Sequence, residues 1–104
     1  MKLEYIEVQE GVKLAYYRKK GNVPLLFLHG LGGSLENWIY SLDFFASKDF
    51  DVIALDLPGY GNSSKERLPY SISFYAEIVK NFIEDIGLET APILIGNSMG
   101  AHIA

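Results

Sequence analysis

The sequence predicts an α/β fold with a mostly parallel sheet, an antiparallel hairpin at its N-terminal side, and helices on both faces. Three short apolar segments, 23–28, 52–55 and 92–95, have the length and composition of strands that helices cover on both faces. Segments with apolar residues at helical spacing alternate with them, and this order is typical of βαβ units. We therefore expect one domain, or part of one, that contains five strands.

The N-terminal residues predict the hairpin. Residues 3–8 alternate between two faces, Glu10-Gly11 has the composition of a turn, and residues 12–17 form a second extended run. Gly21-Asn22 then interrupts the chain before segment 23–28. The hairpin therefore adds an antiparallel edge to the parallel strands.

Two helices are expected between the parallel strands, each after a serine that can cap it. Ser34 is the candidate N-cap of the first helix, and Ser71 or Ser73 of the second, which Gly87 would end. The first apolar stripe comprises Leu35, Trp38, Ile39, Leu42 and Phe45, and the second comprises Phe74, Ile78, Val79, Phe82, Ile83 and Ile86.

The motif that carries chemistry is Gly96-Asn97-Ser98-Met99-Gly100, directly after strand 92–95. It fits G-x-S-x-G, in which a tight strand-to-helix turn exposes a serine nucleophile. The residues that flank the serine must be small, and residues 99–104 are compatible with the helix that should follow. The alternative is an ordinary glycine-rich turn, but the strand–turn–helix context favours Ser98 as a nucleophile.

A second glycine-rich loop, residues 29–34 with the sequence His-Gly-Leu-Gly-Gly-Ser, follows strand 23–28. Two phosphate-binding motifs compete for it. A P-loop requires a Lys, which this loop lacks, and in the dinucleotide pattern G-x-G-x-x-G the third glycine position is Leu35. Nucleotide binding is therefore disfavoured.

A third loop, Asp56-Leu57-Pro58-Gly59-Tyr60-Gly61-Asn62-Ser63, follows strand 52–55. In this order and spacing, the three loops resemble the N-terminal portion of an α/β-hydrolase, in the branch that includes esterases, lactonases and C–C hydrolases. The resemblance covers essentially all 104 residues. It implies that residues 1–104 are the N-terminal part of a single α/β-hydrolase domain, with the first five strands, ending just after the nucleophile elbow.

The resemblance also implies roles for individual residues. Ser98 would attack a carbonyl carbon, and the backbone N–H groups of Leu31 and Met99 would form the oxyanion hole. Gly32 is the alternative donor if the loop turns one residue later. Leu31, Met99, Gly32 and Trp38 would border the substrate. No cofactor and no metal are implied.

The acid and base of a catalytic triad are not evident in these residues. In the family, the order is Ser, then Asp or Glu, then His, so both are expected beyond residue 104. His102 and His29 are weak candidates for the base, and Asp56 is expected to brace its loop rather than to act as the acid. We therefore expect residues 1–104 alone to be inactive unless the remainder of the hydrolase chain, or a complementing chain, supplies these groups.

Composition disfavours several classes of protein. The chain is 49% hydrophobic and 21% charged, with a net charge of −4 and no cysteine. It has no electrostatic reason to bind nucleic acid, no disulfide framework, and no apolar run long enough to span a membrane. Its densest basic cluster, Arg18-Lys19-Lys20, is expected to be a solvated strand end. A cytoplasmic location is expected.

Two functions from different classes fit the sequence. The first is a serine hydrolase that acts on a carboxylic ester, a lactone or a related small acyl substrate through an acyl-enzyme. The alternative is a non-catalytic module that keeps the fold and binds a small ligand. A binding module does not need a serine at position 98, so the intact motif favours the enzyme.

Overall fold

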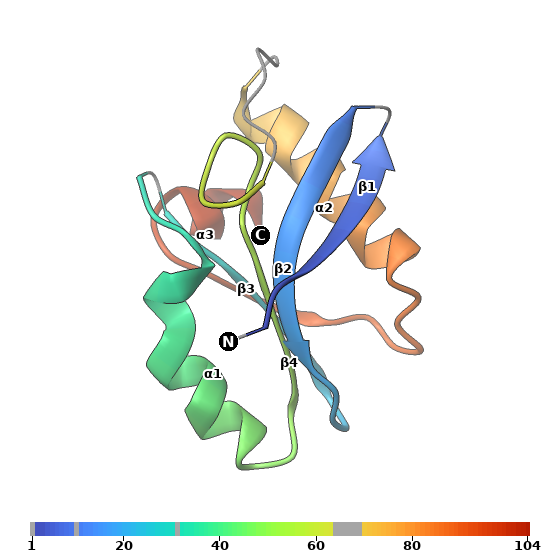
Figure 1. The fold of residues 1–104 in the computed structure, drawn as a ribbon, viewed down its shortest axis with the longest axis vertical. Helices are drawn as coiled ribbons and strands as arrows, with labels where there is room; N and C mark the ends of the chain where they lie inside the picture. The colour runs from blue at the N-terminus through green and yellow to red at the C-terminus, as the bar shows by residue number, and fades with distance from the viewer. Residues whose placement is uncertain (1, 10, 31, 64–69) are drawn as a thin grey trace.

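The computed structural model describes residues 2–9, 11–30, 32–63 and 70–104. These residues form a five-stranded sheet between two layers of helix (Figure 1). The strands are β1 (Glu4–Gln9), β2 (Val12–Lys19), β3 (Pro24–Leu28), β4 (Asp51–Leu55) and β5 (Ile93–Gly96). The helices are the 3-10 helix η1 (Leu35–Trp38), α1 (Ile39–Ala46), α2 (Ile72–Asp85) and α3 (Met99–Ile103).

The order of strands in the sheet is β1-β2-β4-β3-β5. The pairs β1–β2 and β2–β4 are antiparallel, whereas β3 is parallel to both β4 and β5. The predicted α/β fold class, with an antiparallel hairpin beside a parallel sheet, is therefore confirmed. Strands β3 and β4 are buried along their whole length, which explains why their sequences are apolar throughout except for Asp51 at the start of β4.

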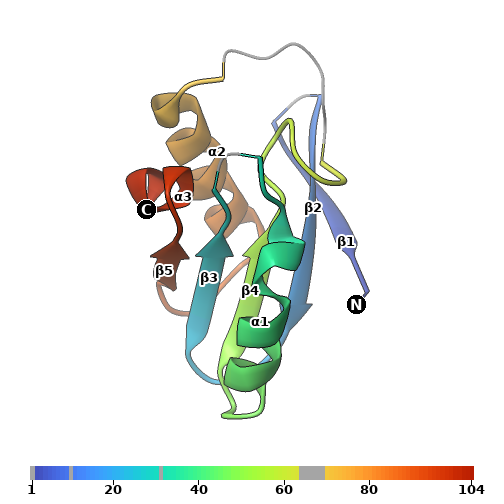
Figure 2. The same ribbon diagram turned by 90° about the vertical axis from the view of Figure 1, so that its left-hand side faces the viewer.

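Each face of the sheet has its own core. Helices α2 and α3 cover one face, with Leu26, Ile53, Ile78, Phe82 and Ile103 among the buried residues. Helices η1 and α1 cover the other face, where the buried residues are Leu25, Phe27, Leu35, Leu42, Val52 and Ala54. Figure 2 shows α1 in front of the sheet and α2 behind it.

The helix starts agree with the predicted caps. The Ser71 side chain accepts a hydrogen bond from the Phe74 N–H at the start of α2. The Ser34 side chain accepts one from the Glu36 N–H, and Asn37 completes a reciprocal capping box. One detail differs from expectation, because the first turn after Ser34 is a 3-10 helix and the α-helix begins only at Ile39.

Candidate active site

Three strand ends bring the candidate residues to one edge of the sheet. Leu28, the last residue of β3, is in register with Leu55 of β4 and with Gly96 of β5. The loops that follow these residues therefore start at the same level, and Figure 2 shows them together above the carboxyl ends of the strands. In open parallel sheets, this edge is where ligands bind.

Ser98 lies in the turn between β5 and α3 and has a strained backbone. Its φ is 56° and its ψ is −116°, a conformation that residues with a Cβ rarely adopt. The side chain is exposed, and its hydroxyl makes no hydrogen bond to any residue that the structure describes. This geometry is that of a nucleophile elbow, in which a sharp turn presents the serine above the sheet.

Close backbone contacts explain the two glycines that flank the elbow. A Cβ on Gly96 would meet the backbone of Gly100 and Ala101. A Cβ on Gly100 would meet the carbonyl oxygen of Leu28, and it would lie 2.8 Å from that of His29. The turn can therefore form only where both positions lack a side chain, as the sequence motif predicts.

Two of the three residues predicted to form the oxyanion hole, Gly32 and Met99, are among the described residues. Leu31 lies outside the described residues. The Met99 N–H opens helix α3 and has no acceptor among the residues that the structure describes, as an oxyanion donor requires. Gly32, the alternative donor, is exposed and has a φ of 77°. The roles of these three residues stay predictions.

His29 is a structural residue in this geometry. It is fully buried, and its Nδ1 lies 2.8 Å from the Gly30 carbonyl oxygen, while its Nε2 accepts a hydrogen bond of 3.0 Å from the Leu57 N–H. Burial lowers the pKa of His29, and the bond to Gly30 and the negative charge of Asp56 oppose this effect. With both nitrogens engaged, His29 cannot serve as the base for Ser98 in this arrangement.

His102 does not meet Ser98 either. It lies on α3, is exposed, and makes no hydrogen bond to the Ser98 hydroxyl in the described part of the chain. Only its backbone N–H contacts the serine, at 3.3 Å from the Ser98 carbonyl oxygen. Neither histidine of the described residues is therefore placed to act as a general base for the Ser98 hydroxyl.

Asp56 joins two of the three loops. Its carboxylate accepts hydrogen bonds from the Leu35 N–H at 2.7 Å and from the Asn62 N–H at 3.0 Å, and it is 1% exposed. The Ser63 hydroxyl donates to the Asp56 carbonyl oxygen at 2.5 Å and accepts from the Ala15 N–H at 2.8 Å. Asp56 thus braces its loop, and its oxygens are occupied by backbone amides.

Trp38 has two environments. Its ring packs on Phe27, with centroids 5.1 Å apart, so a large part of it belongs to the core. It also lines a cavity of about 250 Å³ together with His29, Gly30, Asn37, Gly96 and Asn97. Its indole Nε1 is buried and has no acceptor among the described residues. Trp38 therefore lies beside the elbow, and its predicted contact with substrate is untested.

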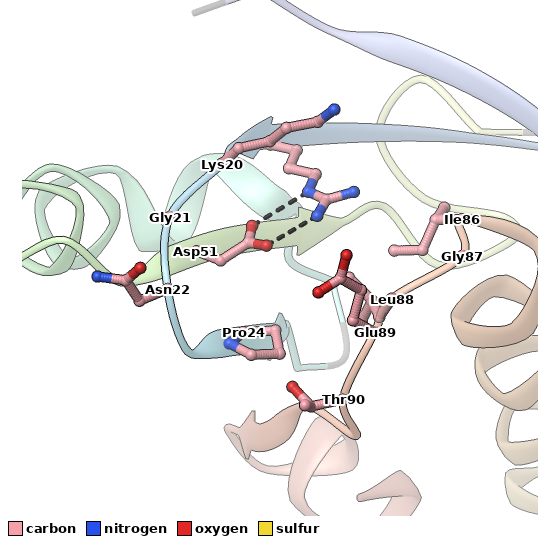
Figure 3. A pocket seen from close by; sticks show the side chains of 11 residues that line it. Lys20, Gly21, Asn22, Pro24, Asp51, Ile86, Gly87, Leu88, Glu89 and Thr90 are labelled. Carbon is pink, nitrogen blue, oxygen red and sulfur yellow. Dashed lines mark hydrogen bonds and ion pairs between the residues drawn. The ribbon is translucent and has the colours of Figure 1, made fainter.

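A larger cavity, of about 370 Å³, lies at the opposite end of the sheet (Figure 3). It is lined by residues around the start of β3 and β4 and by the loop after α2, including Pro24, Asp51 and Glu89. Strands β3 and β4 start beside this cavity and run away from it, and the loop that contains Ser98 lies at the other end of the sheet, after β5. This cavity is therefore separate from the candidate site at Ser98.

One wall of this cavity contains an ion pair that the sequence did not predict. The Arg18 guanidinium donates to both oxygens of Asp51, at 3.0 and 2.7 Å. The hydrogen bond to Asp51 raises the pKa of Arg18. The two side chains are only 17% and 7% exposed. The expectation of a solvated strand end at residues 18–20 is thus wrong for Arg18, because Asp51 of β4 pairs with it.

Two further classes of site, a membrane span and a metal centre, are absent from the described residues. No helix in that part of the chain has the length and apolarity needed to cross a membrane. In the same residues, no group of three or more His, Cys, Asp or Glu side chains is placed to hold a metal ion.

Comparison with known proteins identifies the family of this chain. Residues 23–104 match the family model of the alpha/beta hydrolase fold, and the chain belongs to this family. The relatives include the dihydrolipoyllysine-residue acetyltransferase component of the acetoin cleaving system of Cupriavidus necator, which is 40% identical over 96 residues. That match covers 91% of this chain and 25% of the relative.

Two solved structures are similar over nearly the whole chain. A membrane phospholipase A described as a bacterial virulence factor has a TM-score of 0.89 and 37% identity, covering 99% of this chain and 33% of that one. Est816, described as an N-acyl homoserine lactone degrading enzyme, has a TM-score of 0.87 and 30% identity, covering 96% and 38%. This chain thus spans between a quarter and two fifths of these proteins.

Proposed function

We propose that the complete protein is a serine hydrolase that acts on a carboxylic ester, a lactone or a related small acyl substrate. The observation that carries this proposal is the exposed Ser98 hydroxyl on a strained strand-to-helix turn. A strained backbone persists only where the surrounding structure imposes it, and such strain concentrates at functional sites. Similarity to a phospholipase A and to a lactone-degrading enzyme supports acyl substrates.

In the proposed reaction, the Ser98 hydroxyl loses its proton to a general base as its oxygen attacks the carbonyl carbon of the substrate. Backbone N–H groups, with Met99 as one donor, stabilise the negative charge that develops on the carbonyl oxygen. The leaving group takes a proton from the base, and water then cleaves the acyl-serine ester. An ester gives the alcohol first and then the acid, whereas a lactone gives a single hydroxy acid, and in both cases the Ser98 hydroxyl is restored when the base returns the proton taken from water.

We further propose that the triad acid and base come from residues outside 1–104, in a continuation of the chain or in a complementing chain. The occupied nitrogens of His29 and the exposed position of His102 support this proposal. A non-catalytic ligand-binding module remains the competing hypothesis, and it predicts no covalent chemistry at Ser98.

The decisive experiment is labelling of the complete protein with a fluorophosphonate, followed by mass mapping of the adduct. We expect one adduct on Ser98, and loss of both labelling and ester hydrolysis in Ser98→Ala. Ser73→Ala provides a matched control, because Ser73 is exposed near the start of α2. Absence of labelling, or an adduct on another residue, would contradict the proposed nucleophile.

A further inference from the structure

The cavity around the Arg18–Asp51 ion pair is bounded by residues that the structure describes. We call it the ion-pair cavity: a space of about 370 Å³ between the turn that joins β2 to β3 and the loop that joins α2 to β5 (Figure 3). Pockets that hold small molecules have volumes of about 300–1,000 Å³. Its lining comes from residues 18–24, 51 and 86–90, so the cavity does not depend on the triad groups proposed to lie outside residues 1–104.

Arg18 offers this cavity one edge of its guanidinium group. Asp51 accepts from Nε at 3.0 Å and from Nη2 at 2.7 Å. The third nitrogen, Nη1, has no acceptor among the residues that the structure describes. A guanidinium has five N–H donors, so it can bind a second carboxylate through Nη1 and Nη2 while Asp51 holds the other edge. The bidentate pair also fixes the plane of the guanidinium, and the second edge is therefore preorganised.

The other charged groups of the ion-pair cavity are Lys20 and Glu89, which come from different segments. Both are exposed, and neither forms an ion pair with another residue in the described part of the chain. Together with Arg18 and Asp51 they give the lining two cationic and two anionic side chains, and hence no net charge. Glu89 repels a ligand that is only an anion, and Lys20 repels one that is only a cation. A ligand with both charges finds a partner for each.

The lining also has an apolar part and uncharged polar groups. Pro24 at the start of β3 is buried, and Ile86 and Leu88 after α2 are half-buried. The Thr90 hydroxyl and the Asn22 carboxamide add groups that can donate or accept a hydrogen bond. Apolar surface combined with a few convergent polar groups is typical of small-molecule sites.

The segments that form the rim are held in place without a ligand. The Asn22 N–H donates to the Asp49 carbonyl oxygen at 2.8 Å, and the Asp51 N–H donates to that of Val23 at 2.9 Å. These bonds fix the turn after β2 to the start of β4. On the other side, Gly87 has a φ of 68°, which is the usual conformation of a glycine that ends a helix. Preformed walls reduce the cost of ordering when a ligand binds.

We propose that the ion-pair cavity binds a small zwitterion with an apolar body, namely an α-amino acid with an aliphatic side chain. Its carboxylate accepts from the second edge of Arg18 and lies on the side of Lys20. Its ammonium donates to Glu89, and its aliphatic part packs against the apolar residues, Pro24 among them. This binding function goes beyond the proposed hydrolysis and does not involve Ser98.

Isothermal titration of the complete protein with L-leucine tests the proposal. We expect saturable binding with a Kd of about 1 mM or lower. Isoamylamine lacks the carboxylate of leucine and isocaproate lacks the ammonium. Each should bind at least tenfold more weakly, because a hydrogen bond between charged groups is lost. No saturation with L-leucine, or binding of either analogue as tight as that of L-leucine, would overturn the proposal.

Substitutions at exposed residues show whether the ligand occupies this cavity. Lys20→Gln and Glu89→Gln each remove one charge from the lining and should weaken L-leucine binding at least tenfold. Lys19→Gln and Asp85→Asn are the matched controls, because both residues are exposed and neither lines the cavity. We expect the controls to bind L-leucine as the wild type does. Equal effects of the cavity variants and the controls would refute the site.

Amide NMR of the wild-type complete protein gives a second test that needs no variant. Titration with L-leucine should shift the signals of Gly21, Gly87 and Thr90, which line the cavity, and leave those of Gly96 and Ser98 unchanged. Shifts at Ser98 without shifts at Gly21 would place the ligand at the elbow and overturn the proposal. The two proposals fail separately, because absence of leucine binding does not affect labelling of Ser98, and absence of labelling does not affect leucine binding.

Discussion

Replacement of Asp56 by Asn should destabilise the protein strongly although the two side chains have nearly the same shape. The carboxylate accepts from two backbone amides, one at 2.7 Å and one at 3.0 Å. An Asn side chain can accept from one of them, and its NH₂ group must then face the other donor. Either orientation leaves a backbone N–H at this 1%-exposed site without an acceptor.

The expected size follows from the two bonds. Hydrogen bonds to a charged group contribute about 1.5–3 kcal/mol each, and neutral ones about half of that. Asp56→Asn removes one charge-assisted bond and makes the other neutral, so the free energy of unfolding should fall by roughly 2–4 kcal/mol. Gly61 leaves no space for relief, because even a Cβ at this position would meet the Asp56 carboxylate.

The assay is equilibrium urea unfolding of the complete protein, read from the midpoint and the slope. Asp43→Asn on the exposed face of α1 is the matched control, and we expect a change within about 0.5 kcal/mol for it. A loss below about 1 kcal/mol for Asp56→Asn, at an unchanged slope, would refute the view that the charge of Asp56 braces the two loops.

Three further comparisons between variants test the site and the scaffold. Ser98→Gly and Ser98→Ala both remove the hydroxyl, but only Gly relieves the backbone strain, so the Gly variant should be more stable by about 1 kcal/mol in urea unfolding; equal stability would argue against strain. Arg18→Met should cost about 3 kcal/mol in thermal unfolding because it leaves Asp51 buried and unpaired, and adding Asp51→Asn should recover part of this loss. Gly100→Ala should cost about 3 kcal/mol or more by clashing with backbone, against about 1 kcal/mol for Gly32→Ala, where the new Cβ meets nothing within 4 Å.

The sequence was sufficient to predict the strands, the helix caps and the elbow because each depends on residues close together in the chain. Continuous apolar runs predict buried strands, and a serine before a helical stripe predicts a cap. The glycines around Ser98 predict the tight turn for the same local reason. The sheet order confirms the strands, and the capping bonds of Ser34 and Ser71 confirm the caps. The backbone of Ser98 has the predicted tight turn, whereas its role as a nucleophile stays a prediction.

The polar pairs could not be predicted because they join distant residues. Arg18 and Asp51 are 33 positions apart, and nothing in the triplet at 18–20 distinguishes the arginine that turns inward from the lysines. Asp56 and Leu35 are 21 positions apart, and the acceptor of a backbone amide leaves no pattern in the sequence. Such pairs require strand order and register, which only the folded chain provides.

The hydrogen bonds between the loops hold the surroundings of Ser98 in place without any catalytic acid or base. His29 ties the glycine loop to the loop after β4, Asp56 ties that second loop to the start of η1, and the Leu28 carbonyl accepts from the Asn97 N–H beside the elbow. Each tie uses a buried or main-chain group, so substrate binding does not have to create it. Preorganised donors stabilise a developing charge without a cost of reorganisation at the moment of reaction. If the proposed function is correct, these residues supply the nucleophile and a fixed electrostatic frame for it, and the groups that move protons are a separate requirement.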